Sequence, residues 1–337
     1  MAYTAISDII VPQVFAPYML EQSLEKNALI KSGLVAMNPA LSAALAGGGL
    51  TFNFPSFRNA DESSTAANVS SSDATSNATP EKMVGRSNIA VRMERNKVWQ
   101  STDLTASVAG ADPLLALAAQ LGDSINKWRT ATLFSLLAGV VNETNMASNV
   151  NTIASESVSG AGVATKISSG AIIDTLGAWG DMASSAQGVA LVMHSDVYRA
   201  LQKLEPTAFL PLSTTNIFFP AFMGMPVLVD DRYTKRAGTT DGSVYTTFYF
   251  KPGALEFGMT PHANAVEPFR APLAGNGGGA ETLSVRDIFT YHVVGTKFTS
   301  NTITGDLPTD ANLALAANWA LAYSAKAVGV AALIHNI

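Results

Sequence analysis

Few residues of this chain have the types and spacing that chemistry requires. His194, Ser195 and Asp196 carry the letters of a catalytic triad. Consecutive residues seldom adopt triad geometry, however, and Ser195 is better interpreted as the cap of a helix that follows. The other three histidines, His262, His292 and His335, are far apart in sequence. We therefore predict structural roles for all four histidines.

One pair of adjacent carboxylates, Asp230 and Asp231, follows a predicted strand. Two carboxylates could bind a cation or act as an acid and base pair. Adjacent residues on a strand point to opposite faces, so the pair would need a turn to act together. The sequence favours an ordinary loop at the end of a strand.

The motifs of nucleotide and metal chemistry are missing from the sequence. The chain has no Gly-Lys pair for a phosphate loop, and the Gly160-Ala-Gly162 string lacks both the third glycine and a preceding strand of a dinucleotide site. GxSxG and HExxH strings are also absent, and there are no cysteines for disulfides, thiolate ligands or nucleophiles. We predict no catalytic, cofactor or metal site, and therefore no enzyme.

Composition narrows the class of protein further. Charged residues make up 14% of the 337 residues, where about a quarter is typical, and the net charge is -5. A negative chain lacks the field that draws a protein to specific DNA sequences. The alanine-rich segment Ala311–Ile334 is interrupted by Asn, Ser and Lys, so no membrane span is predicted. The N-terminus lacks the features of a signal peptide, and we expect an intracellular product.

The first half of the chain looks extended rather than compact. Residues 1–49 contain several prolines and spaced apolar anchors, among them Phe15 and Tyr18, and predict an arm. Apolar residues then alternate in 50–54 and again in 89–93, on either side of a Ser- and Thr-rich loop. We predict a two-stranded ribbon over 50–100, which is marginal alone in water and so must rest on another surface, such as a second copy.

The returning arm of this ribbon is basic. Its cations are Lys82, Arg86, Arg92, Arg95 and Lys97. They either complement acidic groups on another copy or form a solvated strand face, and the sequence favours neither interpretation over the other.

A long helix and a compact block follow the ribbon. Asp112 and Pro113 form a helix start, and apolar residues spaced by three and four continue to about Val141. Residues 165–275 mix short helices and strands, including strands predicted at 189–193, 226–230, 246–250 and 254–257. A glycine-rich loop at 275–279 precedes one long alternating strand, whose inner face is Leu283, Val285, Phe289, Tyr291 and Val293.

Three strings, together with this order of elements, resemble the major capsid proteins of tailed bacteriophages, which have the Hong Kong 97-type fold. The strings are SDIIVPQVFAPYMLEQSLEKNALIKSGLV (Ser7–Val35), GMPVLVDDRY (Gly224–Tyr233) and PTDANLALAANWALAYSAKAVGVAALIHNI (Pro308–Ile337). The resemblance implies an α+β fold. Its parts would be an N-terminal arm (1–49), an extended loop (50–100), a peripheral domain with a spine helix (101–164), an axial domain (165–282), and a return strand with C-terminal segment of the peripheral domain (283–337).

The resemblance also implies a structural function. Copies would assemble in the host cytoplasm as hexamers and pentamers of an icosahedral head, become part of the virion capsid, and enclose double-stranded DNA through non-specific contacts. Because the chain begins at the arm, we expect a separate scaffolding protein or an earlier cleavage, together with a portal and room for a decoration protein. The residues predicted to contact other subunits are Phe15, Tyr18, Phe52, Phe54, Arg86, Arg92, Arg95 and Lys97.

Two alternatives remain open at this point. An encapsulin-like compartment shares the fold but encloses an enzyme. A soluble α/β enzyme or binding module would instead be a compact monomer with a site assembled from distant residues.

Overall fold

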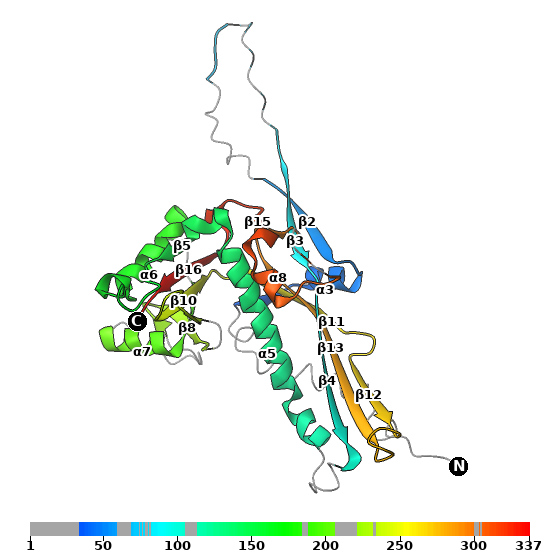
Figure 1. Cartoon of the computed structure of the whole chain (residues 1–337). Coiled ribbons are helices and arrows are strands. Elements are labelled where there is room, and N and C mark those ends of the chain that lie inside the picture. The colour runs from blue at the N-terminus through cyan, green and yellow to red at the C-terminus, as the bar shows by residue number, and fades with distance from the viewer. Residues whose placement is uncertain are drawn as a thin grey trace.

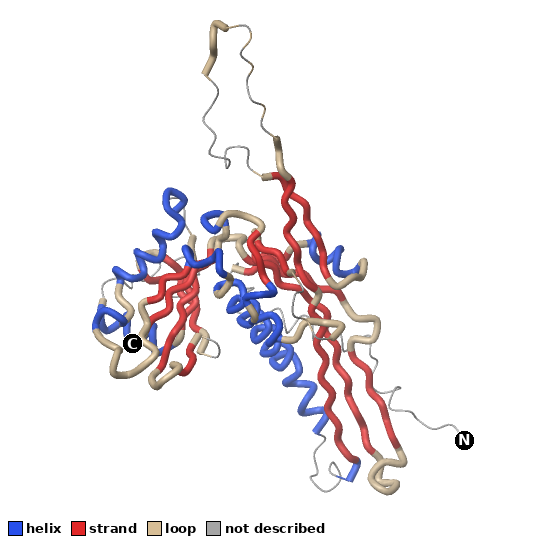
Figure 2. Tube along the Cα trace, turned by 45° about the horizontal axis from the view of Figure 1, so that its top comes forward, coloured by secondary structure: helices blue, strands red, loops and turns tan. Residues whose placement is uncertain are grey.

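A computed structural model describes residues 34–58, 69–73, 75, 77, 80, 82–104, 113–183, 188–205, 221–231, 234–299, 303 and 305–337. Figure 1 shows a compact block on one side, a long helix beside long strands on the other, and a pair of strands that projects beyond both. The same three parts are separate in the second view (Figure 2). The chain is thus built from a block, an elongated body and a projecting hairpin.

The elongated body is organised around one long strand, β13 (Ala280–Val293). Strand β4 (Met93–Thr102) runs antiparallel along one side of β13. Strands β11 (Leu255–Thr260) and β12 (Val266–Ala271) lie along its other side, and β1 (Val35–Met37) is parallel to β11. We call these five strands the long sheet.

One face of the long sheet is covered by helix α5 (Pro113–Val141), which confirms the predicted long helix. The odd-numbered residues of β13 point toward α5, because side chains alternate along a strand. Leu283 and Val285 pack with Leu121 and Ile125 of the helix. The 29 residues of α5 span about 40 Å and support β13 over most of its length.

The opposite face of the long sheet packs against α3 (Pro39–Ala46) and the inner ends of two strands of a four-stranded small sheet, β2 (Thr51–Phe57) and β3 (Gly85–Val91). The small sheet also contains β14 (Thr296–Phe298) and β15 (Trp319–Leu321). Helix α3 approaches closely at Gly258, where a Cβ atom would lie 2.8 Å from the Cβ of Leu41. A glycine is therefore required there by packing.

The compact block contains a second core around a seven-stranded sheet. Its strands are β5 (Val150–Thr152), β16 (Val330–His335), β10 (Ser243–Phe250), β6 (Ala190–Met193), β8 (Met225–Val229), β7 (Ala221–Phe222) and β9 (Lys235–Ala237). Helices α6 (Ser169–Leu176) and α7 (Ser195–Leu204) pack with the same core. The strands predicted at 189–193, 226–230 and 246–250 are confirmed here.

The strand partners differ from the prediction in three places. Strand β4 leaves the predicted ribbon and pairs with β13, so the hairpin is only β2 and β3. Strands β11 and β12 fall in the predicted axial segment 165–282 but belong to the long sheet. Conversely, β16 falls in the predicted peripheral segment 283–337 but pairs with β10 and β5. Periodicity identifies a strand without identifying its partner, which explains all three differences.

The segment that ends the chain ties the two bodies together. Its described elements are α8 (Asp310–Ala314), the 3-10 turns η7 (Ala316–Asn318) and η8 (Ala325–Ala327), and the strands β15 and β16. Trp319 Nε1 donates a hydrogen bond of 2.7 Å to the carbonyl oxygen of Leu313, beside Gly139 of α5. Within the described part of the chain, no helix has the length and apolar character to cross a membrane.

Candidate assembly surfaces

The outer end of the hairpin carries apolar side chains that are exposed in the described part of the chain. Strands β2 and β3 pair from Thr51 and Val91 out to Phe57 and Gly85. Phe57 is 77% exposed, and Met83, just before β3, is 66% exposed. Apolar groups gathered at one exposed end mark a surface for another molecule.

The inner end of the hairpin is instead part of this chain's own core. Phe52, predicted to contact another subunit, is only 7% exposed and packs with Leu41, Leu45 and Ile288. The prediction for Phe52 is corrected, because other residues of the same chain already cover most of its side chain. Phe54 is partly buried against the same cluster. Phe15 and Tyr18 lie outside the described residues.

The predicted basic contact residues have partners within the chain. Arg95 Nη2 lies 2.6 Å from Asp310 Oδ1, and Arg92 Nη2 lies 3.3 Å from Glu94 Oε2. The Arg86 guanidinium lies 5.7 Å from the centre of the Tyr323 ring, and Lys97 Nζ lies 5.5 Å from that of Trp99. The predicted basic segment is therefore divided between the hairpin and the long sheet, and most of its cations interact with groups of the same chain.

Sequence reasoning missed Phe57, although the sequence contains the signal. In β2 the even positions Phe52 and Phe54 point inward, while the odd positions are exposed. Phe57 is a large apolar residue at an odd position. A large aromatic side chain on the exposed face of a strand indicates a contact with another molecule.

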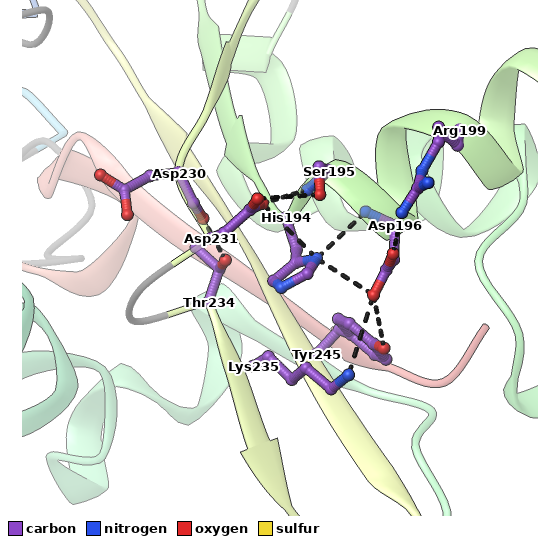
Figure 3. A network of polar contacts seen from close by, with 9 residues as sticks. All are labelled: His194, Ser195, Asp196, Arg199, Asp230, Asp231, Thr234, Lys235 and Tyr245. Carbon is purple, nitrogen blue, oxygen red and sulfur yellow. Dashed lines mark hydrogen bonds and ion pairs between the residues drawn. The ribbon is translucent and has the colours of Figure 1, made fainter.

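A polar network at the start of α7 corrects the predicted helix cap (Figure 3). His194, and not Ser195, is the N-cap, since His194 Nδ1 accepts a hydrogen bond of 3.0 Å from the backbone N–H of Asp196. The Ser195 backbone N–H and hydroxyl donate to Asp231, at 2.6 and 2.9 Å. Asp231 thereby holds the loop after β8 against the start of α7.

This network does not have the geometry of a catalytic triad. The Ser195 hydroxyl donates to Asp231 rather than to His194. Asp196 instead accepts from Arg199 and from Tyr245. Burial alone would raise the pKa of the Asp231 carboxyl, but the bonds from Ser195 hold it below its ordinary value, as expected for an ionised clamp.

Two further observations concern ligands. Among the described residues, no group of three or more His, Asp or Glu side chains could hold a metal ion.

One groove of about 530 Å³, beside Tyr245 and the C-terminal Ile337, is lined by three cations that are separated in sequence: Lys166, Arg199 and Lys203. Folding thus brings together three cations that the sequence left apart.

Comparison with known proteins identifies the family. The major capsid protein of Bacillus phage SPP1 is 31% identical over 340 residues, which cover 100% of this chain and 99% of that protein. This chain belongs to the major capsid proteins of tailed bacteriophages. No family model matches the chain.

Solved structures agree with the fold of this capsid protein. The capsid of Ralstonia phage GP4 matches with a TM-score of 0.57 and 8% identity, and covers 93% of this chain and 90% of that one. The capsid asymmetric unit of cyanophage Pam1 matches with a TM-score of 0.56 and 11% identity, covering 88% and 87%. At such low identity these structures establish the shared mixed α+β fold alone.

Family membership gives this capsid protein a structural role. It is a component of the virion, and its copies form the icosahedral shell of the phage head. Such a shell is a lattice of many copies of one chain, so the exposed hairpin end belongs to a protein that functions as a homo-oligomer. The protein is not an enzyme.

Proposed function

We propose that this capsid protein forms hexamers and pentamers that close into a head around double-stranded DNA. In this arrangement the compact block lies near the centre of each ring. The long sheet and α5 form the outer part of each subunit. The hairpin lies over a neighbouring subunit.

The observation that carries this proposal is the apolar outer end of the hairpin. Phe57, Met83 and Val84 remain 77%, 66% and 42% exposed within their own chain. A two-stranded ribbon is marginally stable by itself in water, so these side chains are better placed against a neighbour. Phe54 and Arg86, next along the hairpin, remain proposed contact residues.

The composition supports large contacts between subunits. Only 14% of the residues are charged, so broad surfaces can be buried without burying unpaired ions. Arg92, Arg95 and Lys97 remain proposed contact residues at the edge formed by β4. For Arg92 and Arg95 the contribution would come from the part of their charge that Glu94 and Asp310 leave unsatisfied.

The proposed partners follow from head assembly. A scaffolding protein would guide closure, a portal would occupy one vertex, and a decoration protein could bind the finished shell. Contact with DNA would be weak and independent of sequence, because the net charge is -5. We assign this contact to the groove lined by Lys166, Arg199 and Lys203, in which Arg199 also pairs with Asp196.

Electron microscopy with mass analysis of the expressed protein tests this function. The protein is expressed alone and with neighbouring genes from its source. Closed shells, or hexamers and pentamers of one chain, support the proposal. Closed shells that contain an enzyme and no portal would favour the encapsulin-like alternative, whereas a stable monomer under all conditions would contradict both.

A further inference from the structure

His292 of β13 is a buried imidazole with no hydrogen-bond partner among the described residues. It is 3% exposed, and neither Nδ1 nor Nε2 meets a donor or acceptor there. Buried polar groups without partners are uncommon, and each one is costly. The buried His335 differs, because its two ring nitrogens meet Thr247 and Asn336. His292 therefore is not explained by an internal hydrogen-bond network.

The position of His292 places it in the layer between the long sheet and the small sheet. Even-numbered residues of β13 face away from α5. Ile288 packs with Phe52 of β2, and Thr290 Oγ1 donates a hydrogen bond of 2.8 Å to the carbonyl oxygen of Val91 at the end of β3. His292 is the next residue on the same face. It thus extends the row of side chains on which the hairpin strands rest.

Few charges face this layer. Glu256 of β11 is the register partner of His292, and its side chain is partly exposed. Strands β1, β2 and β15 and helix α3 contain no ionisable side chain. The remaining charges near this layer are the cations Lys297 of β14, Arg86 of β3 and Arg92 after β3, and one carboxylate, Glu94 of β4. Glu94 is the register partner of Ile288 and already pairs with Arg92. An imidazolium at position 292 would therefore meet cations and apolar groups, with Glu256 as the nearest carboxylate by register.

We propose that His292 is an acid-sensitive latch, which keeps the small sheet on the long sheet while neutral and releases it when protonated. Protonation places an unpaired charge in the layer, and the imidazolium can gain solvent and the Glu256 carboxylate only if the layer opens. At the level of the shell the inference rests on the proposed function, because release would loosen the hairpin that lies over a neighbour. The predicted opening of the small sheet in a single chain does not depend on the proposed function.

The size of the effect follows from proton linkage. Burial lowers the pKa of His292 from 6.5 to about 4. In the opened layer the imidazole regains its ordinary pKa, so the opened form binds the proton more readily between these values, and opening increases as the pH falls through this window. With those two values, the opening equilibrium increases about 30-fold between about pH 7.5 and about pH 5.

Hydrogen exchange of the full-length protein at these two pH values tests the latch. Rates are corrected for intrinsic exchange and compared for β3, which is part of the small sheet, and β6, which is part of the block. We expect protection of β3 to fall about 30-fold at the lower pH. Strand β6 shares a sheet with the buried His335, so any acid response of β6 should be the same in the wild type and in His292→Leu. In His292→Leu the acid response of β3 should disappear. In the control His262→Gln, whose ring is partly exposed and lies 3.9 Å from Glu94, the response should remain.

Two outcomes overturn the latch: equal β3 protection at both pH values in the wild type, or an undiminished acid response in His292→Leu. If the leucine variant does not fold, titration of the wild-type imidazole by NMR replaces it, and an ordinary pKa for His292 overturns the inference. Micrographs of wild-type shells near pH 7.5 test the proposed function separately. If shells form but β3 shows no acid response, only the latch is contradicted. If β3 responds to acid but no shells form, only the proposed function is contradicted.

Discussion

Arg129 of α5 and Asp287 of β13 form a two-point ion pair between the long helix and the long strand. Arg129 Nε lies 2.7 Å from Asp287 Oδ2, and Nη2 lies 2.6 Å from Oδ1. Arg129 is 1% exposed, and its guanidinium lies 5.5 Å from the centre of the Phe257 ring and 5.6 Å from that of Phe289. This contact fixes the helix in register with the strand, since a bidentate pair is satisfied in only one alignment.

Removing one member of this pair should destabilise the fold strongly. In Arg129→Leu the Asp287 carboxylate remains buried without its partner, so we expect the free energy of unfolding to fall by about 3–5 kcal/mol. Urea denaturation measures the change. The matched control is Arg199→Leu, whose guanidinium is 65% exposed beside Asp196, and its loss should be far smaller. Equal losses in the two variants would contradict a special role for the buried pair.

A single methyl group at Gly139 should detach the C-terminal segment from α5. A Cβ atom there would overlap the carbonyl oxygen of Leu313 and lie 2.5 Å from Trp319 Nε1, so Gly139→Ala breaks the hydrogen bond between them. We expect a loss of about 3 kcal/mol in unfolding free energy and a change in tryptophan fluorescence. Gly177→Ala is the control, because its Cβ meets nothing within 4 Å. A stable Gly139→Ala variant would refute this close packing.

Two phenylalanines of one strand should separate folding from assembly. Phe57→Ser changes a 77% exposed side chain, so the subunit should fold normally but require a higher concentration to form shells. Phe52→Ser changes a 7% exposed side chain and should lower the thermal stability of the subunit itself. Calorimetry and light scattering report the two effects. Unimpaired assembly of Phe57→Ser would argue against the proposed hairpin contact.

Acid should weaken the compact block through His335. Burial lowers its pKa to about 4, and the bond from its Nδ1–H to the Asn336 carbonyl oxygen only partly opposes that effect. The unfolded chain binds the proton more readily, so stability is complete above about pH 6.5 and falls as the pH drops toward 4, by about 3 kcal/mol. Denaturation midpoints across this range measure the slope. His335→Gln should make it shallower and leave the part that His292 contributes, and an unchanged slope would exclude His335 as a source.

Local patterns in the sequence predicted the elements well. Asp112 and Pro113 placed the start of α5, and the structure begins this helix at Pro113 and ends it at Val141. Alternation in β13 predicted its buried face, and Leu283, Val285 and Phe289 are all buried. Helix caps and strand parity depend on neighbours a few residues away, so a sequence contains enough information to predict them.

Long-range partners could not be predicted in the same way. Nothing near β4 indicates that it pairs with β13 rather than with the hairpin, because an alternating strand fits any apolar edge. The same limit applies to contact residues. Phe52 and Phe57 are both aromatic residues of one strand, and only the packing of α3 buries the first and leaves the second exposed.

The sequence by itself determined the family, the long helix, the period of each strand and the absence of catalytic motifs, since these depend on residue identity and short-range spacing. The tertiary structure decided which strands share a sheet, which charges are neutralised internally, and which apolar groups remain for other subunits. Arg95 illustrates the difference: its partner Asp310 is 215 residues away, and no local pattern can encode a contact that exists only after the chain has closed that distance.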